Sequence, residues 1–131
     1  MSVDSVGDFL TIIRNGTRVA KPFVLAPYSN EKMAIARILK SEGFVRDVSE
    51  HADDAGKRYV KVVLKYVDGE SVIHEIRRVS KPGCRVYAGA KGIKPVIGGL
   101  GLSIVSTDRG VVSHKDAKKN GAGGEVICTV W

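Results

Sequence analysis

Apolar residues recur every three to four positions at the start of the chain, a spacing typical of helices. Positions 6, 9, 10 and 13 follow this spacing, and Asp4 or Ser5 can cap the first turn through a side-chain oxygen. The pattern therefore predicts a helix over residues 4–19, with Gly16 as a weak interior point. Its outward, polar face carries Arg14 and Asn15.

A second helix is expected after Ser29 or Asn30, with apolar residues at positions 34, 35, 38 and 39 and a stop at Gly43. Elsewhere in this part of the chain, apolar and polar residues alternate as they do in strands. Strands are expected at residues 23–26, 44–48, 57–66 and 72–79, the last of them after a hairpin turn at Asp68-Gly69. The pattern predicts two helices against a three-stranded sheet.

The second part of the chain shows mostly strand patterns. Strands are expected at residues 84–87, 102–105, 111–112 and 126–131, with positions 126, 128 and 130 on one face of the last strand. Short helices are expected from Lys94-Pro95 to Gly98-Gly99 and from Ser113 to Lys119. Together the patterns predict an α+β fold of two small lobes. Residues 1–77 form an N-terminal α/β lobe, and residues 78–131 form a C-terminal, mostly β lobe with short helices.

Charge is distributed unevenly between these two lobes. The chain has 131 residues and a net charge of +7. Residues 1–77 hold 12 Lys and Arg against 11 Asp and Glu, whereas residues 78–131 hold 9 against 3. A basic excess of this size favours a polyanionic partner, which is a nucleic acid or an anionic membrane surface. The excess lies in the C-terminal lobe, so we expect the partner to bind there.

Length and composition set the broad class of the protein. A chain of this length can bury enough surface for a stable core, and a hydrophobic content of 44% argues against disorder. No apolar run reaches the ~20 residues that span a membrane, and the N-terminus lacks the pattern of a secretory signal. Cys84 and Cys128 are far apart in the sequence. We therefore expect reduced thiols in a cytoplasmic protein.

No catalytic or metal-binding pattern stands out. His51, His74 and His114 share no ligand spacing with each other or with the cysteines, so no metal site is expected. Ser106 and Asp108 supply, with His114, the residue types of a triad, but nothing resembles a nucleophile elbow. Glycines at positions 98, 99 and 101 precede a strand instead of following one, unlike a dinucleotide-binding loop. We expect no catalytic residue, no cofactor, no small-molecule substrate and no enzymatic activity.

Binding residues are expected near the C-terminus. Ser106 and Thr107 are small hydroxyl residues at the end of an apolar strand, and they can donate to phosphate or ribose oxygens at close range. The alternative is a turn that the hydroxyls stabilise through backbone bonds. Gly123 and Gly124 allow backbone N–H groups to reach a ligand, or else form a flexible turn. Glu125 can accept a hydrogen bond from a base amino group or an RNA hydroxyl, or pair with a lysine.

Aromatic and basic residues extend this candidate surface. Tyr87 ends a predicted strand beside glycines, so it can stack on an exposed base or belong to the core. Phosphate contacts are expected from the lysines of the C-terminal lobe, namely Lys91, Lys94, Lys115, Lys118 and Lys119. Arg14 and Arg18 of the first helix can form a second contact face.

Three stretches of the sequence resemble a known family over essentially the whole chain. They are "DFLTIIRNG", "ILKSEGFVRDV" and the run from "RRVSKPGCRVYAGAKG" to "GGEVICTVW". The last run contains a Ser-Thr turn, a Lys/Ala-rich helix, Gly-Gly-Glu and a final tryptophan, in this order. The chain is similar to the eighth protein of the small ribosomal subunit in its bacterial form.

This resemblance implies a structural component of the small ribosomal subunit that binds the central domain of the ribosomal RNA directly and supports subunit assembly. Its partners would be this RNA, neighbouring small-subunit proteins and, where a messenger imitates the ribosomal site, its own messenger RNA. The family's binding motifs match Ser106 and Thr107, Gly123 to Glu125, and Arg85 with Tyr87. Its first-helix motif matches Arg14 and Asn15, a secondary RNA contact.

Two residues depart from the family pattern. Asp108 stands where the family usually has a third hydroxyl, and an acid there would repel phosphate unless it points away or pairs with Arg109. Ser5 stands where proline is common, which leaves the detail of the N-terminal contact open. Two other functions are open from the residues alone: a DNA- or membrane-binding module, because it would also be basic, and a small hydrolase that uses Ser106, Cys84 or Cys128.

Overall fold

The computed structural model describes residues 4–89, 92 and 101–131. In chain order these residues form α1 (Ser5–Arg18), β1 (Phe23–Pro27), α2 (Asn30–Ser41), β2 (Val45–Ala52), β3 (Arg58–Leu64), β4 (Tyr66–Val67), β5 (Glu70–Ser71), β6 (Ile76–Arg78), β7 (Tyr87–Ala88), β8 (Leu102–Thr107), β9 (Gly110–Ser113), α3 (His114–Lys119) and β10 (Gly124–Val130). These elements confirm the predicted α+β fold. Lys91, Lys94 and the helix expected from Lys94-Pro95 to Gly98-Gly99 lie outside the described residues.

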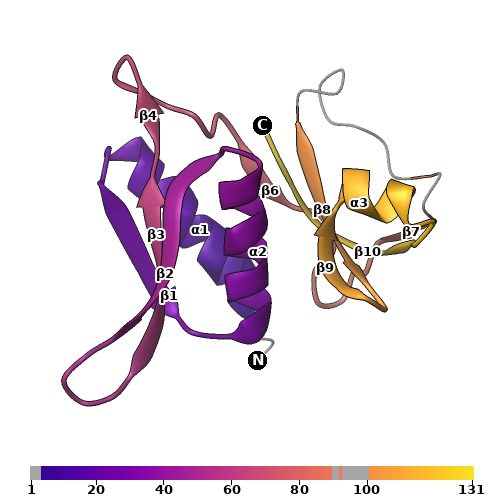
Figure 1. Cartoon of the computed structure of the whole chain (residues 1–131), viewed down its shortest axis with the longest axis horizontal. Coiled ribbons are helices and arrows are strands. Elements are labelled where there is room, and N and C mark those ends of the chain that lie inside the picture. Colours follow the sequence, from indigo (N-terminus) through magenta and orange to yellow (C-terminus); the bar gives the residue numbers. More distant parts are fainter. Residues whose placement is uncertain (1–3, 90–91, 93–100) are drawn as a thin grey trace.

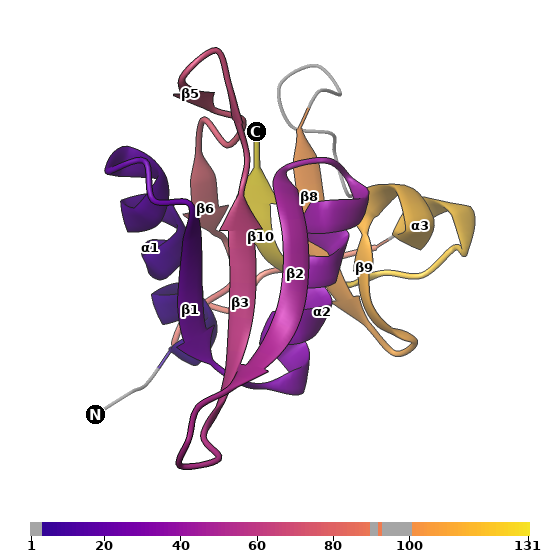
Figure 2. The same ribbon diagram turned by 60° about the vertical axis from the view of Figure 1, so that its left-hand side comes forward.

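Helices α1 and α2 lie between two antiparallel sheets (Figure 1). The first sheet has the strand order β1-β3-β2, and Figure 2 shows it in front of both helices. The second sheet has the order β6-β10-β8-β9, and β7 also pairs with β10. Strands β4 and β5 form a separate hairpin whose turn residues, Asp68 and Gly69, both have positive φ. The hairpin predicted at this position is confirmed.

Side-chain caps begin both long helices. The Asp4 carboxylate accepts a hydrogen bond from the backbone N–H of Gly7 at 3.0 Å, and the Ser29 hydroxyl accepts one from the N–H of Lys32 at 3.2 Å. These contacts select one cap from each pair that the sequence allowed. Gly16 has a packing role, because a β-carbon there would stand 2.5 Å from Val24 Cγ1. The glycine therefore allows α1 to approach β1 closely.

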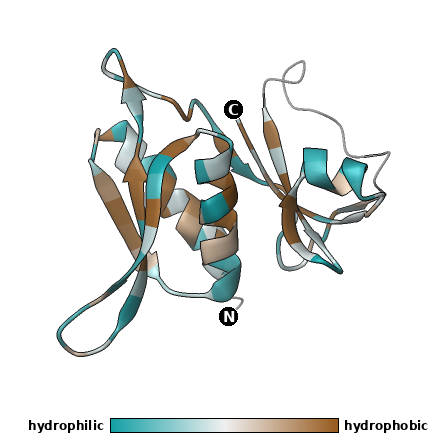
Figure 3. Ribbon diagram, in the orientation of Figure 1, coloured by the Kyte–Doolittle hydropathy of each residue, from teal (hydrophilic) through white to brown (hydrophobic). Residues whose placement is uncertain are grey.

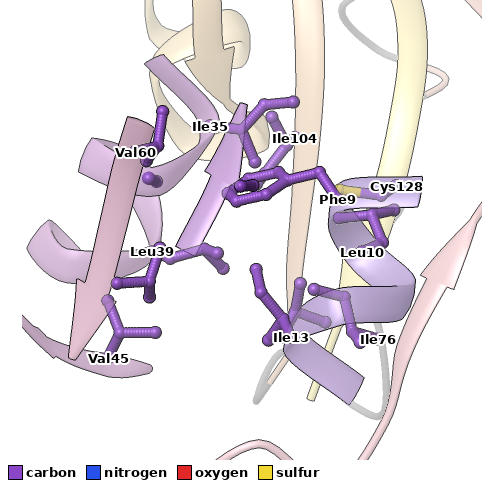
Figure 4. Close-up of a cluster of buried hydrophobic side chains, with 14 of the residues drawn as sticks. Phe9, Leu10, Ile13, Ile35, Leu39, Val45, Val60, Ile76, Ile104 and Cys128 are labelled. Atoms are coloured by element: carbon purple, nitrogen blue, oxygen red, sulfur yellow. The ribbon is translucent and has the colours of Figure 1, made fainter. Parts of the chain in front are cut away.

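One hydrophobic core joins the two sheets through the helices. Four fully buried residues from both helices and the second sheet belong to one cluster: Phe9 of α1, Ile35 of α2, Ile104 of β8 and Cys128 of β10 (Figure 4). Figure 3 shows hydrophobic residues along the strands and helix faces that meet there. The helices thus bury apolar side chains against both sheets, and this shared core fixes the position of the second sheet relative to α1.

The segment from 72 to 79 differs from the prediction of a continuous strand. Only β6 is a strand, and it belongs to the second sheet, where Ile76 lies opposite Val130. Just before β6, the backbone N–H groups of His74 and Glu75 donate to the Trp131 carbonyl at 2.7 and 2.8 Å. The alternation correctly indicated extended chain, but it carried no information about a pairing partner more than 50 residues away.

Two further strands have bounds other than those expected. The strand predicted at 84–87 is limited to β7, because Lys81 and Cys84 close a turn in which Gly83 has a φ of 84°. Strand β10 begins at Gly124 and contains a bulge next to Val126, so the simple alternation of buried positions is wrong there. Ile127 is consequently buried together with its neighbour in the core.

Candidate nucleic-acid interface

Three neighbouring strands bring together residues that are far apart in the sequence. Glu125 of β10 lies opposite Tyr87 of β7 on one side and opposite Ser106 of β8 on the other. Side chains in such a row project from the same face of the sheet. We call Tyr87, Ser106 and Glu125 the β8–β10 surface. Tyr87 is 70% exposed, which excludes a core role for its ring and leaves it accessible to a ligand.

Gly124 lies where β8 and β10 approach most closely. A β-carbon at this position would stand 2.0 Å from the Ser106 carbonyl oxygen and 3.1 Å from Thr107 Cα. No side chain fits this space, so glycine is required by the contact between the strands. Gly123 precedes the strand and is exposed. The two glycines predicted as one motif therefore have different surroundings.

The two hydroxyls at the end of β8 also differ in their partners. Thr107 Oγ1 donates to the Gly110 carbonyl at 2.8 Å and accepts from the Arg109 N–H at 3.1 Å. It therefore stabilises the turn between β8 and β9. Consecutive strand residues project to opposite faces, so Ser106 shares the face of Glu125 and Thr107 does not. The Ser106 hydroxyl takes part in none of the side-chain hydrogen bonds among the described residues, which leaves it open to a ligand.

Glu125 is held by two partners from the segment before β7. The Ser80 hydroxyl donates to Glu125 Oε2, and Arg85 Nη1 lies 2.9 Å from the same oxygen. Ser80 also accepts the Val86 N–H at 3.0 Å, so this cluster fixes the backbone that leads to Tyr87. The hydrogen bond from Ser80, together with Arg85, holds the pKa of Glu125 below its ordinary value, although burial acts in the opposite direction. Glu125 is thus an ionised carboxylate that pairs with arginine.

Ser80 is a member of this cluster that the sequence did not reveal. Its side chain is fully buried, and it connects β10 to the segment before β7 through Glu125. A serine before the Pro82-Gly83 turn carries no pattern that distinguishes it from an ordinary loop residue. Only the register of β10 identifies its role.

The lysines of α3 lie on the other side of the sheet from the β8–β10 surface. Helix α3 packs on β8 through Ala117, which contacts Val105. Val105 precedes Ser106 in the strand, so α3 covers the opposite face of the sheet. Lys118 and Lys119 are exposed in the last turn of this helix. They add positive charge to the C-terminal lobe, but on the side of the sheet away from the β8–β10 surface.

Other predicted binding residues lie elsewhere. Lys115 Nζ is 3.3 Å from Glu42 Oε2, so this lysine contacts the end of α2. Arg14 donates to the Ile76 carbonyl, near the far end of β10, and Asn15 is exposed on α1. The structure therefore brings Arg85 and Tyr87 to the β8–β10 surface but places Arg14 and Asn15 away from it.

Asp108, the acid that departs from the family pattern, is exposed in the turn after β8. Among the described residues it forms no salt bridge, so the expected pairing with Arg109 is not seen. Its carboxylate is therefore free to turn toward solvent.

The structure gives no support for a triad or a metal centre. His114 is buried, and its Nδ1 accepts the Ser103 N–H at 3.1 Å, while burial lowers its pKa. The imidazole thus has a structural role, because it connects the first residue of α3 to β8. Within the described ranges, no group of His, Cys, Asp and Glu side chains could hold a metal ion. None of the described helices combines the length and apolar character needed to cross a membrane.

The fold and this surface define a small basic α+β protein that carries its candidate binding residues on one face of a sheet. Residues 4–131 match the family described as Ribosomal protein S8. Small ribosomal subunit protein uS8 of Thermus thermophilus is 48% identical over 139 residues, and all of both chains is covered. The same protein of Rhodopirellula baltica is 47% identical over 132 residues, with 99% of each chain covered.

The chain therefore belongs to the ribosomal protein S8 family. Family membership places it in the small ribosomal subunit as a structural protein and not as an enzyme. This confirms the resemblance stated from its sequence stretches.

Proposed function

We propose that the protein binds the central domain of the small-subunit ribosomal RNA directly and supports assembly of the subunit. The observation that carries this proposal is the row formed by Tyr87, Glu125 and Ser106 on three adjacent strands. It combines an exposed aromatic ring, a hydroxyl with no hydrogen-bond partner among the described residues, and a carboxylate that is paired with Arg85. The C-terminal lobe of residues 78–131 would supply the principal surface.

Each member of the row suits a different feature of structured RNA. A regular A-form helix hides its base edges in a deep groove, so proteins read its distortions, unstacked bases and 2′-hydroxyls. Tyr87 stacks on an unstacked base. Ser106 donates to a phosphate or ribose oxygen. The exposed Gly123 before β10 lets the RNA approach the backbone there.

Glu125 acts in this proposal chiefly through its neighbours. Its carboxylate accepts from Ser80 and pairs with Arg85, so it orders the segment that presents Tyr87. Arg85 is 48% exposed in its side chain, and a guanidinium has further N–H groups that can donate to phosphate. Glu125 thereby aligns the arginine and the tyrosine for the RNA.

Electrostatic attraction accounts for the approach of the RNA. In this proposal the lysines of the C-terminal lobe supply the positive charge that attracts the RNA, namely Lys91, Lys94, Lys115, Lys118 and Lys119. Arg14 with Asn15 supplies a secondary contact in the N-terminal lobe, residues 1–77. If about five phosphates are engaged, log affinity against log salt has a slope of very roughly −4. A messenger RNA that imitates the ribosomal site would compete for the same surface.

Filter binding to a central-domain RNA fragment tests the proposal. Ser106→Ala and Tyr87→Ala should each weaken binding, Tyr87→Ala by about fivefold or more because base stacking is lost. Ser49→Ala, at an exposed serine of β2, is the matched control and should bind as the unmodified chain does. Full affinity of both surface variants would contradict the proposal, as would equal affinity for duplex DNA or anionic vesicles.

A further inference from the structure

A concave site, distinct from the β8–β10 surface, lies at the opposite end of β10 from Glu125. It is a cavity of about 480 Å³, a size found among small-ligand sites. Residues of α1, of β6 and the segment before it, and of the chain after β10 line it, chiefly Arg14, Arg18, His74, Glu75, Arg77 and Trp131. We call it the Trp131 pocket. Figure 2 shows β6 and the end of β10 beside each other, near α1.

Two aromatic rings form one wall of the Trp131 pocket. The rings of His74 and Trp131 are stacked, with centroids 5.9 Å apart and planes inclined by 6°. His74 is exposed, and Trp131 is half-buried. The Trp131 carbonyl accepts the His74 and Glu75 N–H groups, and the Trp131 N–H donates to the Glu75 carbonyl. The backbone therefore holds this aromatic wall in place before any ligand binds.

Positive charge forms the other wall. Arg14 is fixed by its hydrogen bond to the Ile76 carbonyl, and Arg18 is exposed one turn further along α1. No carboxylate of the described residues forms a salt bridge with either arginine. Glu75 is the acid that lines the pocket, and it is paired with Arg77 at 2.7 Å. The pocket therefore presents two arginines that form no salt bridge with any carboxylate of the described residues.

An aromatic wall that faces uncompensated arginines matches a ligand with a flat ring and an anionic group close together. A nucleotide has both, since its base can stack and its phosphate can accept from guanidinium groups. We propose that the Trp131 pocket binds one unpaired nucleotide of an RNA strand, with the base against His74 and Trp131 and the phosphate at Arg14 and Arg18.

This inference rests on the proposed RNA-binding function and specifies what the secondary contact at Arg14 would hold. Glu125 and Val130 lie near opposite ends of β10, about 17 Å apart at a rise of roughly 3.3 Å per residue. One rigid strand thus connects the β8–β10 surface to the Trp131 pocket. The protein would hold two RNA segments at a fixed separation, a folded one at Ser106 and an unpaired one at Trp131.

The single tryptophan of the sequence makes the test specific to this pocket. Indole fluorescence of the full chain is followed while a short single-stranded oligoadenylate is added. Stacking of adenine should quench the fluorescence in a saturable manner. His74→Ala should weaken binding by about fivefold, and Arg18→Ala should reduce the slope of log affinity against log salt by about 1. Arg37→Ala, at another exposed helical arginine, should change neither.

Two further probes decide what the pocket recognises. An abasic ribose-phosphate oligomer of the same length should not quench the indole, because it lacks the ring, and oligoglutamate should not quench it either. Quenching by either probe as strong as by oligoadenylate, or unchanged quenching in the Arg18 and His74 variants, overturns the inference. Ser106→Ala with Tyr87→Ala should leave the quenching intact, so failure of the β8–β10 surface is separable from failure of the pocket.

Discussion

Gly124 lies so close to Ser106 that a β-carbon at residue 124 would stand 2.0 Å from the Ser106 carbonyl oxygen. The backbones of β8 and β10 can therefore take up their present separation only with glycine at this position. The same contact sets the position of Ser106 relative to Glu125, its partner on the adjacent strand. The packing of the sheet and the geometry of the proposed RNA surface depend on one missing side chain.

Replacement of Gly124 should lower both the stability of the fold and the affinity for RNA. Gly124→Ala is expected to lower the free energy of unfolding by about 1–3 kcal/mol, because the backbone must move to admit the methyl group, and to weaken RNA binding. Urea denaturation and filter binding measure the two effects. Gly89→Ala is the matched control, since a β-carbon there would meet no atom of the described residues within 4 Å. Equal stability of the two variants would show that the close approach is unimportant.

Glu125→Gln should destabilise the segment before β7 in a pH-dependent way. The pKa of Glu125 is lowered from its ordinary value of 4.5, first by Ser80 and then by Arg85, against the opposing effect of burial. A carboxyl with a lowered pKa in the folded state contributes stability above its unfolded pKa and loses it as the pH falls through the folded value. The variant should therefore lose about 1 kcal/mol near neutral pH, and this difference should shrink below pH 4.5.

Chemical denaturation across a pH series provides this measurement, and RNA binding by the same variant shows whether ordering of Arg85 and Tyr87 matters to the RNA. Glu70→Gln, at an exposed position of β5, serves as the control and should change stability little. A constant stability difference from neutral to acid pH would mean that the Glu125 charge does not stabilise the fold.

Asp4→Asn should isolate the ion pair between α1 and β6. Arg78 Nε lies 3.2 Å from Asp4 Oδ2, and both side chains are largely buried. Burial acts to raise the pKa of Asp4, but hydrogen bonds from Arg78 and the Gly7 N–H outweigh it and lower the pKa below 3.8. Asparagine keeps the helix cap, so the expected loss of about 1–2 kcal/mol reports the lost charge. It should disappear as the pH falls below 3.8.

A surface ion pair provides the comparison for this variant. Asp47 pairs with Lys40 at 2.9 Å, but both side chains are more than half exposed. Exposed pairs of this kind contribute little to stability, so Asp47→Asn should have a much smaller effect than Asp4→Asn in the same thermal or urea experiment. Equal effects would argue that the Asp4–Arg78 contact is no more than a surface pair.

The two cysteines should differ sharply in reactivity. Cys84 is exposed, whereas Cys128 is buried in the core, and burial raises the pKa of Cys128 to about 12. Since the thiolate is the reactive form, a thiol reagent at neutral pH should label one cysteine in the folded chain and two in denaturant. Mass spectrometry of the labelled peptides identifies the sites. Rapid labelling of Cys128 in the folded chain would show that the core around β10 opens readily.

Local patterns in the sequence were sufficient for the helices and the β2–β3 hairpin. The cap at Asp4, the stop at Gly43 and the alternation through Val62 each involve residues close together in the chain, and the structure confirms them. Periodicity records which face of an element is buried. It therefore predicted the elements of the first sheet well.

Such local patterns could not predict which strands pair when they are far apart in the sequence. The segment from 72 to 79 looked like a strand, but its partner is β10, and nothing near Ile76 in the sequence indicates this. The bulge that buries Ile127 and the role of Ser80 also depend on the register between distant strands. Ser106 and Thr107 were adjacent in the sequence and thus predicted to act together, yet strand geometry gives them different faces.

The pairing of β6 with β10 has a consequence for biosynthesis. A nascent chain completes both long helices and the first sheet well before residues 124–130 leave the tunnel, yet Ile76 and Phe9 share their core with Val130 and Cys128. Until translation reaches the end of β10, this apolar surface has no cover, and exposed surface of that kind favours aggregation. The core of this polypeptide therefore closes only after residues 124–130 have emerged.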